Sequence, residues 1–218
     1  MDQIYNSIIE ALIFASDEPI TASEIVKAIK STDGKDTQIT TGNIDKVVDE
    51  LNELYQAEDK AFSIKSIAEG FTFCTKPEYA KYIGYITVER SKRRLSQAAV
   101  ETLSIIAYKQ PLTKPELESI RGVNSDYIIS TLLEKNLITI KGRAETIGRP
   151  ILYGTTDEFL MYFGLNKITD LPKPREIDEI MKDEDFLEQK RQIMMNEVEQ
   201  VIEDEVNNSE DRSESTIE

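Results

Sequence analysis

Residues 111–140 read PLTKPELESIRGVNSDYIISTLLEKNLITI, and this stretch decides the fold class. Thr113 and Glu116 form the Thr-x-x-Glu pattern of a capping box, which predicts that a helix begins after Thr113. Gly122 then indicates a turn, and a second amphipathic helix follows over residues 124–135. The stretch ends in a β-favouring segment. Helix, turn, helix and strand are the first elements of a winged helix-turn-helix.

The same pattern occurs twice in the chain. Residues 15–25, ASDEPITASEI, match residues 107–117, AYKQPLTKPEL, at an offset of 92. The first copy has its own capping box at Thr21 and Glu24. The third helix repeats at an offset of 81, with Leu51 corresponding to Leu132, so the first copy carries an insertion. The polar residues 31–37, with Gly34 as helix breaker, are its expected position.

Each third helix is followed by strands. Residues 61–67 and 71–75 alternate around a Glu69-Gly70 turn, which predicts a hairpin, and residues 137–140 and 151–156 have the same character. A helix then closes each copy, over 77–86 and 157–165. The sequence therefore predicts a mainly α fold with small β wings (α+β): two winged helix-turn-helix domains in tandem, then an acidic tail that is partly helical or disordered.

The expected boundaries are a first domain over 1–86, a basic linker over 87–95, a second domain over 96–174 and a tail over 175–218. Ser96 is the expected cap of the first helix in the second domain. The formal net charge is −15. The tail carries 16 acidic and 5 basic residues and accounts for −11 of it, so the body is nearly balanced.

Composition excludes most catalytic chemistry. The 218 residues include no histidine, which removes the commonest general base and metal ligand, and Cys74 is the one cysteine. We expect Cys74 to be a small buried hydrophobe. The sequence contains neither a Walker loop nor a Gly-x-Gly-x-x-Gly motif. No enzymatic activity, metal or cofactor is therefore expected. No apolar run reaches the length of a membrane span and no signal peptide is recognisable, which favours a cytoplasmic protein.

The second helix of the pair would face the major groove if this protein read DNA. Its outward residues are Asp126, Tyr127, Ser130, Thr131 and Glu134, and the first copy presents Asp45, Lys46, Asp49, Glu50 and Glu53. Carboxylates are repelled by phosphate, so neither helix is suited to a duplex. Basic residues occur elsewhere, in the linker (Arg90, Lys92, Arg93, Arg94) and in the second wing (Lys141, Arg143, Arg149). They are interpreted as solvated or ion-paired groups, with weak phosphate contact as the alternative.

Three segments of the second copy carry a resemblance to a known family. LSQAAVETLSIIAYKQPLTK (95–114), IRGVNSD (120–126) and GRPILYGTTDEFLMYFGL (148–165) closely resemble the segregation and condensation protein B family. The likeness extends over about 95–174, is looser over 1–86 and is absent from the tail. The sequence departs from the family at Thr146-Ile147, where a proline is expected beside Gly148.

This resemblance implies a non-enzymatic subunit of the bacterial SMC condensin-like complex. It implies a homodimer joined mainly through its first domains, and a partner, the kleisin subunit segregation and condensation protein A, which connects it to the SMC ATPase. Roles in chromosome condensation, chromosome partition, the cell cycle and cell division follow, in the cytoplasm at the nucleoid. Independently of the resemblance, the carboxylates on both third helices predict that the protein alone binds duplex DNA negligibly. A DNA-binding transcriptional regulator is the alternative, since tandem winged helices often have that function.

Two candidate surfaces follow from residue chemistry. Arginine and tyrosine are common interface anchors, and glycines flank the wing arginines. The candidate kleisin-binding residues are Arg121, Tyr127, Arg143, Arg149, Pro150 and Tyr153. The alternative is structural, with Arg121 and Arg149 locking the wing onto Glu116 or Glu118. The first helix has more apolar residues than one core face requires, so the candidate dimerisation residues are Ile4, Tyr5, Ile8 and Leu12.

The tail shows a thin apolar stripe. Ile180, Leu187, Met194 and Val201 recur at seven-residue spacing among acids, which favours solvation or a helix that forms on binding. Residues 207–218 are polar and acidic and are expected to be disordered.

Overall fold

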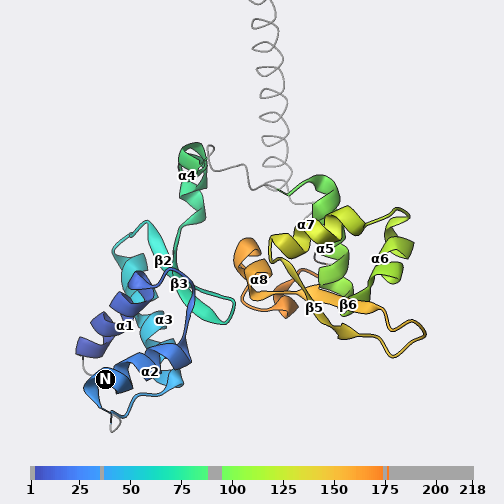
Figure 1. The fold of residues 1–218 in the computed structure, drawn as a ribbon. Coiled ribbons are helices and arrows are strands. Elements are labelled where there is room, and N and C mark those ends of the chain that lie inside the picture. The colour runs from blue at the N-terminus through green and yellow to red at the C-terminus, as the bar shows by residue number, and fades with distance from the viewer. Residues whose placement is uncertain (1–2, 35–36, 88–94, 174–175, 177–218) are drawn as a thin grey trace, which may run out of the picture. The chain divides into compact units, whose positions relative to one another are not determined.

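The computed structural model describes residues 3–34, 37–87, 95–173 and 176 (Figure 1). The linker arginines at 90, 93 and 94 and the tail stripe lie outside these residues, as does the end of the predicted second domain. Within them, no helix combines the length and the apolar character needed to cross a membrane.

The first winged-helix module contains three helices, a three-stranded sheet and a closing helix. Its elements are α1 (Gln3–Ala15), β1 (Ile20–Thr21), α2 (Ala22–Asp33), α3 (Thr41–Ala57), β2 (Phe62–Ile67), β3 (Gly70–Thr75), a 3-10 turn (Pro77–Tyr79) and α4 (Ala80–Thr87). The strand order is β1-β3-β2, all antiparallel. Helix α1 packs against α3 and β3, and α3 also packs against β2. The core between them consists mostly of isoleucine and valine, and includes Ile9, Ile25, Ile44, Val47 and Leu51.

The second module repeats this order. Its elements are α5 (Gln97–Lys109), β4 (Leu112–Thr113), α6 (Lys114–Arg121), α7 (Asp126–Glu134), β5 (Ile138–Arg143), β6 (Ile151–Thr155), α8 (Asp157–Phe163) and a 3-10 turn (Ile168–Asp170). The strand order is β4-β6-β5. Its core includes Leu103, Ile106, Leu117, Ile129 and Leu132. The predicted α+β fold with tandem winged helices is confirmed.

The predicted caps are present and explain where the helices begin. The Thr21 hydroxyl accepts from the Glu24 N–H while the Thr21 N–H donates to the Glu24 carboxylate, and Thr113 and Glu116 repeat this pair. Ser96 accepts from the Ala99 N–H and begins α5. These boundaries were readable because capping depends on residues only three positions apart.

Each wing has a third strand that the sequence did not indicate. The capping threonine and the residue before it pair with the return strand, and Ile20 lies opposite Phe71 in the first module as Leu112 lies opposite Tyr153 in the second. Two residues are too short to show a periodic pattern, so only the fold reveals them.

The predicted Glu69-Gly70 turn was wrong by one residue. Ala68 and Glu69 form the turn, with φ of 50° and 61°, and Gly70 begins β3. A Cβ on Gly70 would lie 2.7 Å from the Pro19 backbone, so glycine is required in the strand for close packing rather than in the turn for its φ. The predicted loop at 31–37 also begins later than expected, because α2 continues to Asp33 before Gly34, at φ 104°.

Candidate partner-binding surfaces

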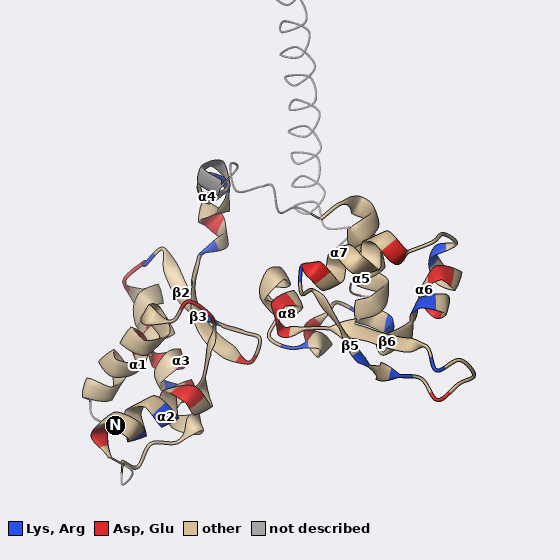
Figure 2. Cartoon of the chain, viewed as in Figure 1, with Lys and Arg blue, Asp and Glu red and all other residues tan. Residues whose placement is uncertain are grey.

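The outward face of α7 is acidic and aromatic, as the sequence predicted. The Tyr127 side chain is 82% exposed, and Asp126, Ser130 and Glu134 are also exposed. Figure 2 shows acidic residues at both ends of this helix. In the first module, the five polar residues predicted for the outward face of α3 are all exposed as well. Neither helix presents the row of cations that phosphate contact requires.

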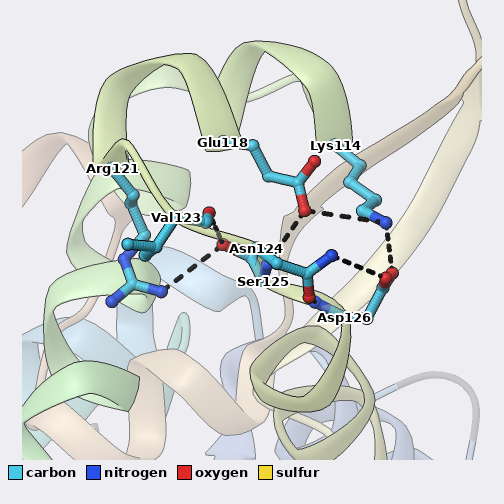
Figure 3. A network of polar contacts seen from close by, with 7 residues as sticks. All are labelled: Lys114, Glu118, Arg121, Val123, Asn124, Ser125 and Asp126. Atoms are coloured by element: carbon cyan, nitrogen blue, oxygen red, sulfur yellow. Dashed lines mark hydrogen bonds and ion pairs between the residues drawn. The ribbon is translucent and has the colours of Figure 1, made fainter.

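Arg121 is the last residue of α6, and its side chain, which is only 7% exposed, lies against the turn between α6 and α7 (Figure 3). Its guanidinium contacts the Glu101 carboxylate of α5 at 3.3 Å and donates to the Ser125 hydroxyl at 3.4 Å. Its Nε is buried without a partner among the described residues. Arg121 therefore connects three helices and is in position to support the surface rather than to form it.

The acids suggested as alternative partners of Arg121 are occupied elsewhere. Glu116 completes its capping box, and Glu118 accepts the Ser125 N–H at 2.9 Å. Lys114 bridges Glu118 and Asp126 across the turn. The hydrogen bond from Lys114, followed by that from Asn124, holds the pKa of Asp126 below its ordinary value, and the same contact with Asp126 raises the pKa of Lys114. The turn thus has a fixed shape and a charged Asp126 at neutral pH.

Around this rigid turn lie apolar side chains that the sequence reading missed. Ile120 and Val123 are 53% and 54% exposed, and both lie a few positions before Tyr127 in the sequence. We call Ile120, Val123 and Tyr127 the turn surface. The sequence feature that could have indicated this surface was Val123, an apolar residue that lies in a turn and outside any helical stripe. Exposed apolar side chains gathered in one segment are typical of a protein-binding site.

The wing residues divide into exposed and buried groups. Arg143 and Arg149 are exposed, as is Lys141, and Figure 2 shows the basic residues along β5. Tyr153 is 9% exposed, opposite Ile140 in the sheet, and Pro150 is half-buried. The Arg143 guanidinium donates to the Arg149 carbonyl at 3.1 Å. Of the six candidate kleisin-binding residues, the two wing arginines and Tyr127 are therefore accessible to a partner.

The wing tip is a tight reversal. Arg149 has a φ of 42°, and its N–H donates to the Thr146 carbonyl at 2.9 Å. Between these residues, Gly148 has a φ of 83°, a conformation that favours glycine, and Ile147 is fully exposed. The departure from the family at Thr146-Ile147 therefore lies at the point of the wing and presents an apolar side chain to solvent.

On the first module, the predicted dimerisation residues differ in accessibility. Ile4 is 65% exposed, whereas Tyr5, Ile8 and Leu12 are partly buried against the module's own core. The most exposed large apolar residue of α1 is Phe14, at 78%, which the sequence reading did not select.

Phe14 borders an aromatic groove of about 530 Å³. Its ring lies 5.8 Å from that of Phe73, which in turn lies 5.6 Å from Phe62. Cys74 also lines this groove and is half-buried rather than in the core. Burial raises the pKa of the Cys74 thiol, so it is protonated and unreactive at neutral pH. The described residues contain no cluster of three or more acids or cysteines able to hold a metal ion.

Two modules, each with three helices, a three-stranded sheet and a closing helix, define a tandem winged-helix protein. The profile of one family, described as segregation and condensation complex subunit ScpB, matches residues 7–174. The chain belongs to this family of chromosome segregation and condensation subunits.

Curated relatives agree with this assignment. Segregation and condensation protein B of Symbiobacterium thermophilum is 46% identical over 171 residues, which cover 78% of this chain and 74% of the relative. The Clostridium botulinum protein of the same name is 41% identical over 179 residues, which cover 82% and 87%. The family description, unlike these names, also states that its members are subunits of a complex.

Solved structures match this chain as well. A conserved hypothetical protein from Chlorobium tepidum is 40% identical, with coverage of 75% of this chain and 97% of that one, at a TM-score of 0.36. ScpB from Mycobacterium tuberculosis is 27% identical, with coverage of 74% and 95%, at a TM-score of 0.34.

Proposed function

We propose that this chain is a non-enzymatic subunit of the SMC condensin-like complex that binds the kleisin, segregation and condensation protein A. Through the kleisin it joins the SMC ATPase, in the cytoplasm at the nucleoid. The observation that carries this proposal is the surface of α7, where Tyr127 is 82% exposed between carboxylates. A protein segment can pack on such a helix, whereas a duplex would meet negative charge.

The second module is the proposed kleisin-binding module. Tyr127, Arg143 and Arg149 are exposed and able to act as anchors. Arg121 and Tyr153 are buried, and Pro150 is half-buried, so these three residues act by holding the turn and the wing in place. Anchors of this type are effective only on a rigid support, because a mobile side chain loses conformational entropy when it binds.

The first module is the proposed dimerisation module. Ile4 and Phe14 leave large apolar side chains in water, and the aromatic groove beside Phe14 adds to that area. Association of two copies would remove this surface from solvent, at about 25 cal/mol for each Å². Phe14 therefore joins Ile4, Tyr5, Ile8 and Leu12 as a candidate interface residue.

Isothermal titration calorimetry of the full chain with the full-length kleisin of the same bacterium tests this function. Tyr127→Ala and Arg149→Ala should each weaken binding about thirtyfold, the effect of losing an anchor of about 2 kcal/mol. Tyr162→Ala, on α8 and 50% exposed, is the matched control and should bind as the wild type does. If wild-type protein does not bind the kleisin, the proposed function is wrong.

A further inference from the structure

Strands β2 and β5 are the corresponding outer strands of the two sheets. In the strand orders β1-β3-β2 and β4-β6-β5, each pairs on one side only. Ile64 in β2 and Ile138 in β5 occupy the same position in their sheets: Ile64 lies opposite Phe73, and Ile138 lies opposite Thr155. An outer strand exposes backbone N–H and C=O groups, which can template a further strand.

In the first module this edge is closed by a side chain. The Ile64 N–H donates to the Asn52 amide oxygen at 2.8 Å, and the Asn52 amide nitrogen donates to the Ile64 carbonyl at 3.0 Å. Asn52 extends from α3 and satisfies both backbone groups, as a neighbouring strand would. The edge of β2 is thereby blocked at its centre.

In the second module the corresponding residue cannot do this. At the repeat offset that aligns Leu51 with Leu132, Asn52 corresponds to Leu133, whose side chain has no hydrogen-bonding atom. Among the described residues, no side chain or loop donates to or accepts from the backbone of Ile138 or Ile140. The edge of β5 therefore lacks the block that closes β2.

The hydrogen-bonding direction of β5 follows from its neighbour. The Thr155 N–H donates to the Gln110 side chain at 2.7 Å, and Tyr153 pairs with Leu112 of β4, so these two residues of β6 direct their backbone groups away from β5. Directly opposite residues in an antiparallel pair share this direction. Ile138 and Ile140 face Thr155 and Tyr153, so their backbone groups point away from β6. Because Ile138 is only 2% exposed and Ile140 is 54% exposed, the accessible part of this edge begins at Ile140.

The side chains along this edge indicate what would bind. Ile140 is 54% exposed, and Lys141 and Arg143 beyond it are exposed. We propose that the open edge of β5 accepts an extended segment of the kleisin as an added strand, with an apolar side chain on Ile140 and acidic side chains near Lys141 and Arg143. This inference rests on the proposed function, which supplies the partner; strand addition supplies affinity through the backbone and specificity through alternate side chains.

Amide exchange measured by NMR on the full chain, with and without full-length kleisin, tests this proposal. The amide of Ile140 should exchange at least tenfold more slowly in the complex. Ile140→Pro removes an outward N–H, which an outer strand tolerates, and should weaken kleisin binding tenfold or more while the melting temperature is kept.

Asn52→Leu is the control: it should speed exchange at Ile64 and leave kleisin affinity unchanged. Kleisin binding with unaltered exchange at Ile140 would overturn strand addition, as would an Ile140→Pro variant that folds and binds normally. Protection of Ile140 that depends only on the concentration of this chain would assign the edge to a second copy and overturn the proposal. A wild type that does not bind the kleisin would overturn the proposed function, and this inference with it.

Discussion

The phenol of Tyr55 donates a 2.5 Å hydrogen bond to the carboxylate of Glu10, which connects α3 to α1 across 45 positions of the chain. Tyr55 is 4% exposed. Burial, and then the bond to Glu10, raises the pKa of this phenol, so it is protonated and remains a donor at neutral pH. The contact holds together the two helices beside the aromatic groove.

Tyr55→Phe should lower the free energy of unfolding by about 1–2 kcal/mol, because the Glu10 carboxylate loses its donor in a partly buried position. The ring contact with Phe62, at 5.2 Å, would be kept, so packing changes little. Urea unfolding measures the difference. Tyr82→Phe, at a tyrosine that is 62% exposed, is the control and should change stability by less than about 0.5 kcal/mol. Equal effects of the two variants would contradict this role.

Glu116→Gln should make the stability of the fold depend less steeply on pH below neutrality. The hydrogen bonds from the Thr113 hydroxyl and N–H lower the pKa of Glu116 from its ordinary value of 4.5. Stability from this carboxylate is therefore full above pH 4.5 and is lost as the pH falls through the lower folded value. Glutamine keeps the capping geometry but does not titrate. Thermal melts from pH 3 to 7 should show a shallower decline than wild type; parallel curves would exclude the linkage.

Arg121→Ala and Arg149→Ala should have different effects. Arg121 is buried between Glu101 and Ser125, so its loss should cost about 1–3 kcal/mol of stability and should weaken the kleisin affinity of the folded fraction less than Arg149→Ala does. Arg149 is exposed, so its loss should reduce affinity and leave the melting temperature unchanged. Scanning calorimetry and titration calorimetry on both variants separate these effects. A lower melting temperature with unchanged affinity for Arg149→Ala would assign Arg149 a structural role.

Ile4→Asp and Phe14→Asp should each convert the dimer to a monomer, because a charge would be buried in an apolar interface. These positions are preferable to Ile8, which also packs on the core, so that Ile8→Asp would mix unfolding with dissociation. Sedimentation velocity at tens of micromolar gives the mass. Ile120→Asp, in the second module and 53% exposed, is the control and should stay dimeric. A monomeric wild type would refute the dimer.

Fluorescence anisotropy with a mixed-sequence duplex should show negligible binding by the chain alone at physiological salt. The exposed carboxylates of α3 and α7 repel phosphate where a DNA reader has cations. Submicromolar, sequence-selective binding would instead support a transcriptional regulator.

The local features of this fold were predictable and the contacts between distant residues were not. Thr21 with Glu24 identified a helix start because the pair lies within one turn. The partner of Arg121 was unpredictable, since Glu101 is 20 residues away and nearer acids were available. Gly70 was placed in the turn because its contact with Pro19 exists only in the folded sheet. Similarly, Phe14 and Ile8 are alike in the sequence, and only packing decides which one is exposed.

The Asn52 amide also limits how copies of this chain can join edge to edge. Strands β1 and β4 are two residues long, too short to template much pairing, so β2 and β5 are the sheet edges that matter among the described strands. Two unblocked sheet edges per molecule would permit head-to-tail pairing into fibres, whereas one unblocked edge permits only a closed pair. The hydrogen-bonded amide of Asn52 thus removes one of the two edges through which the sheets of different copies could pair.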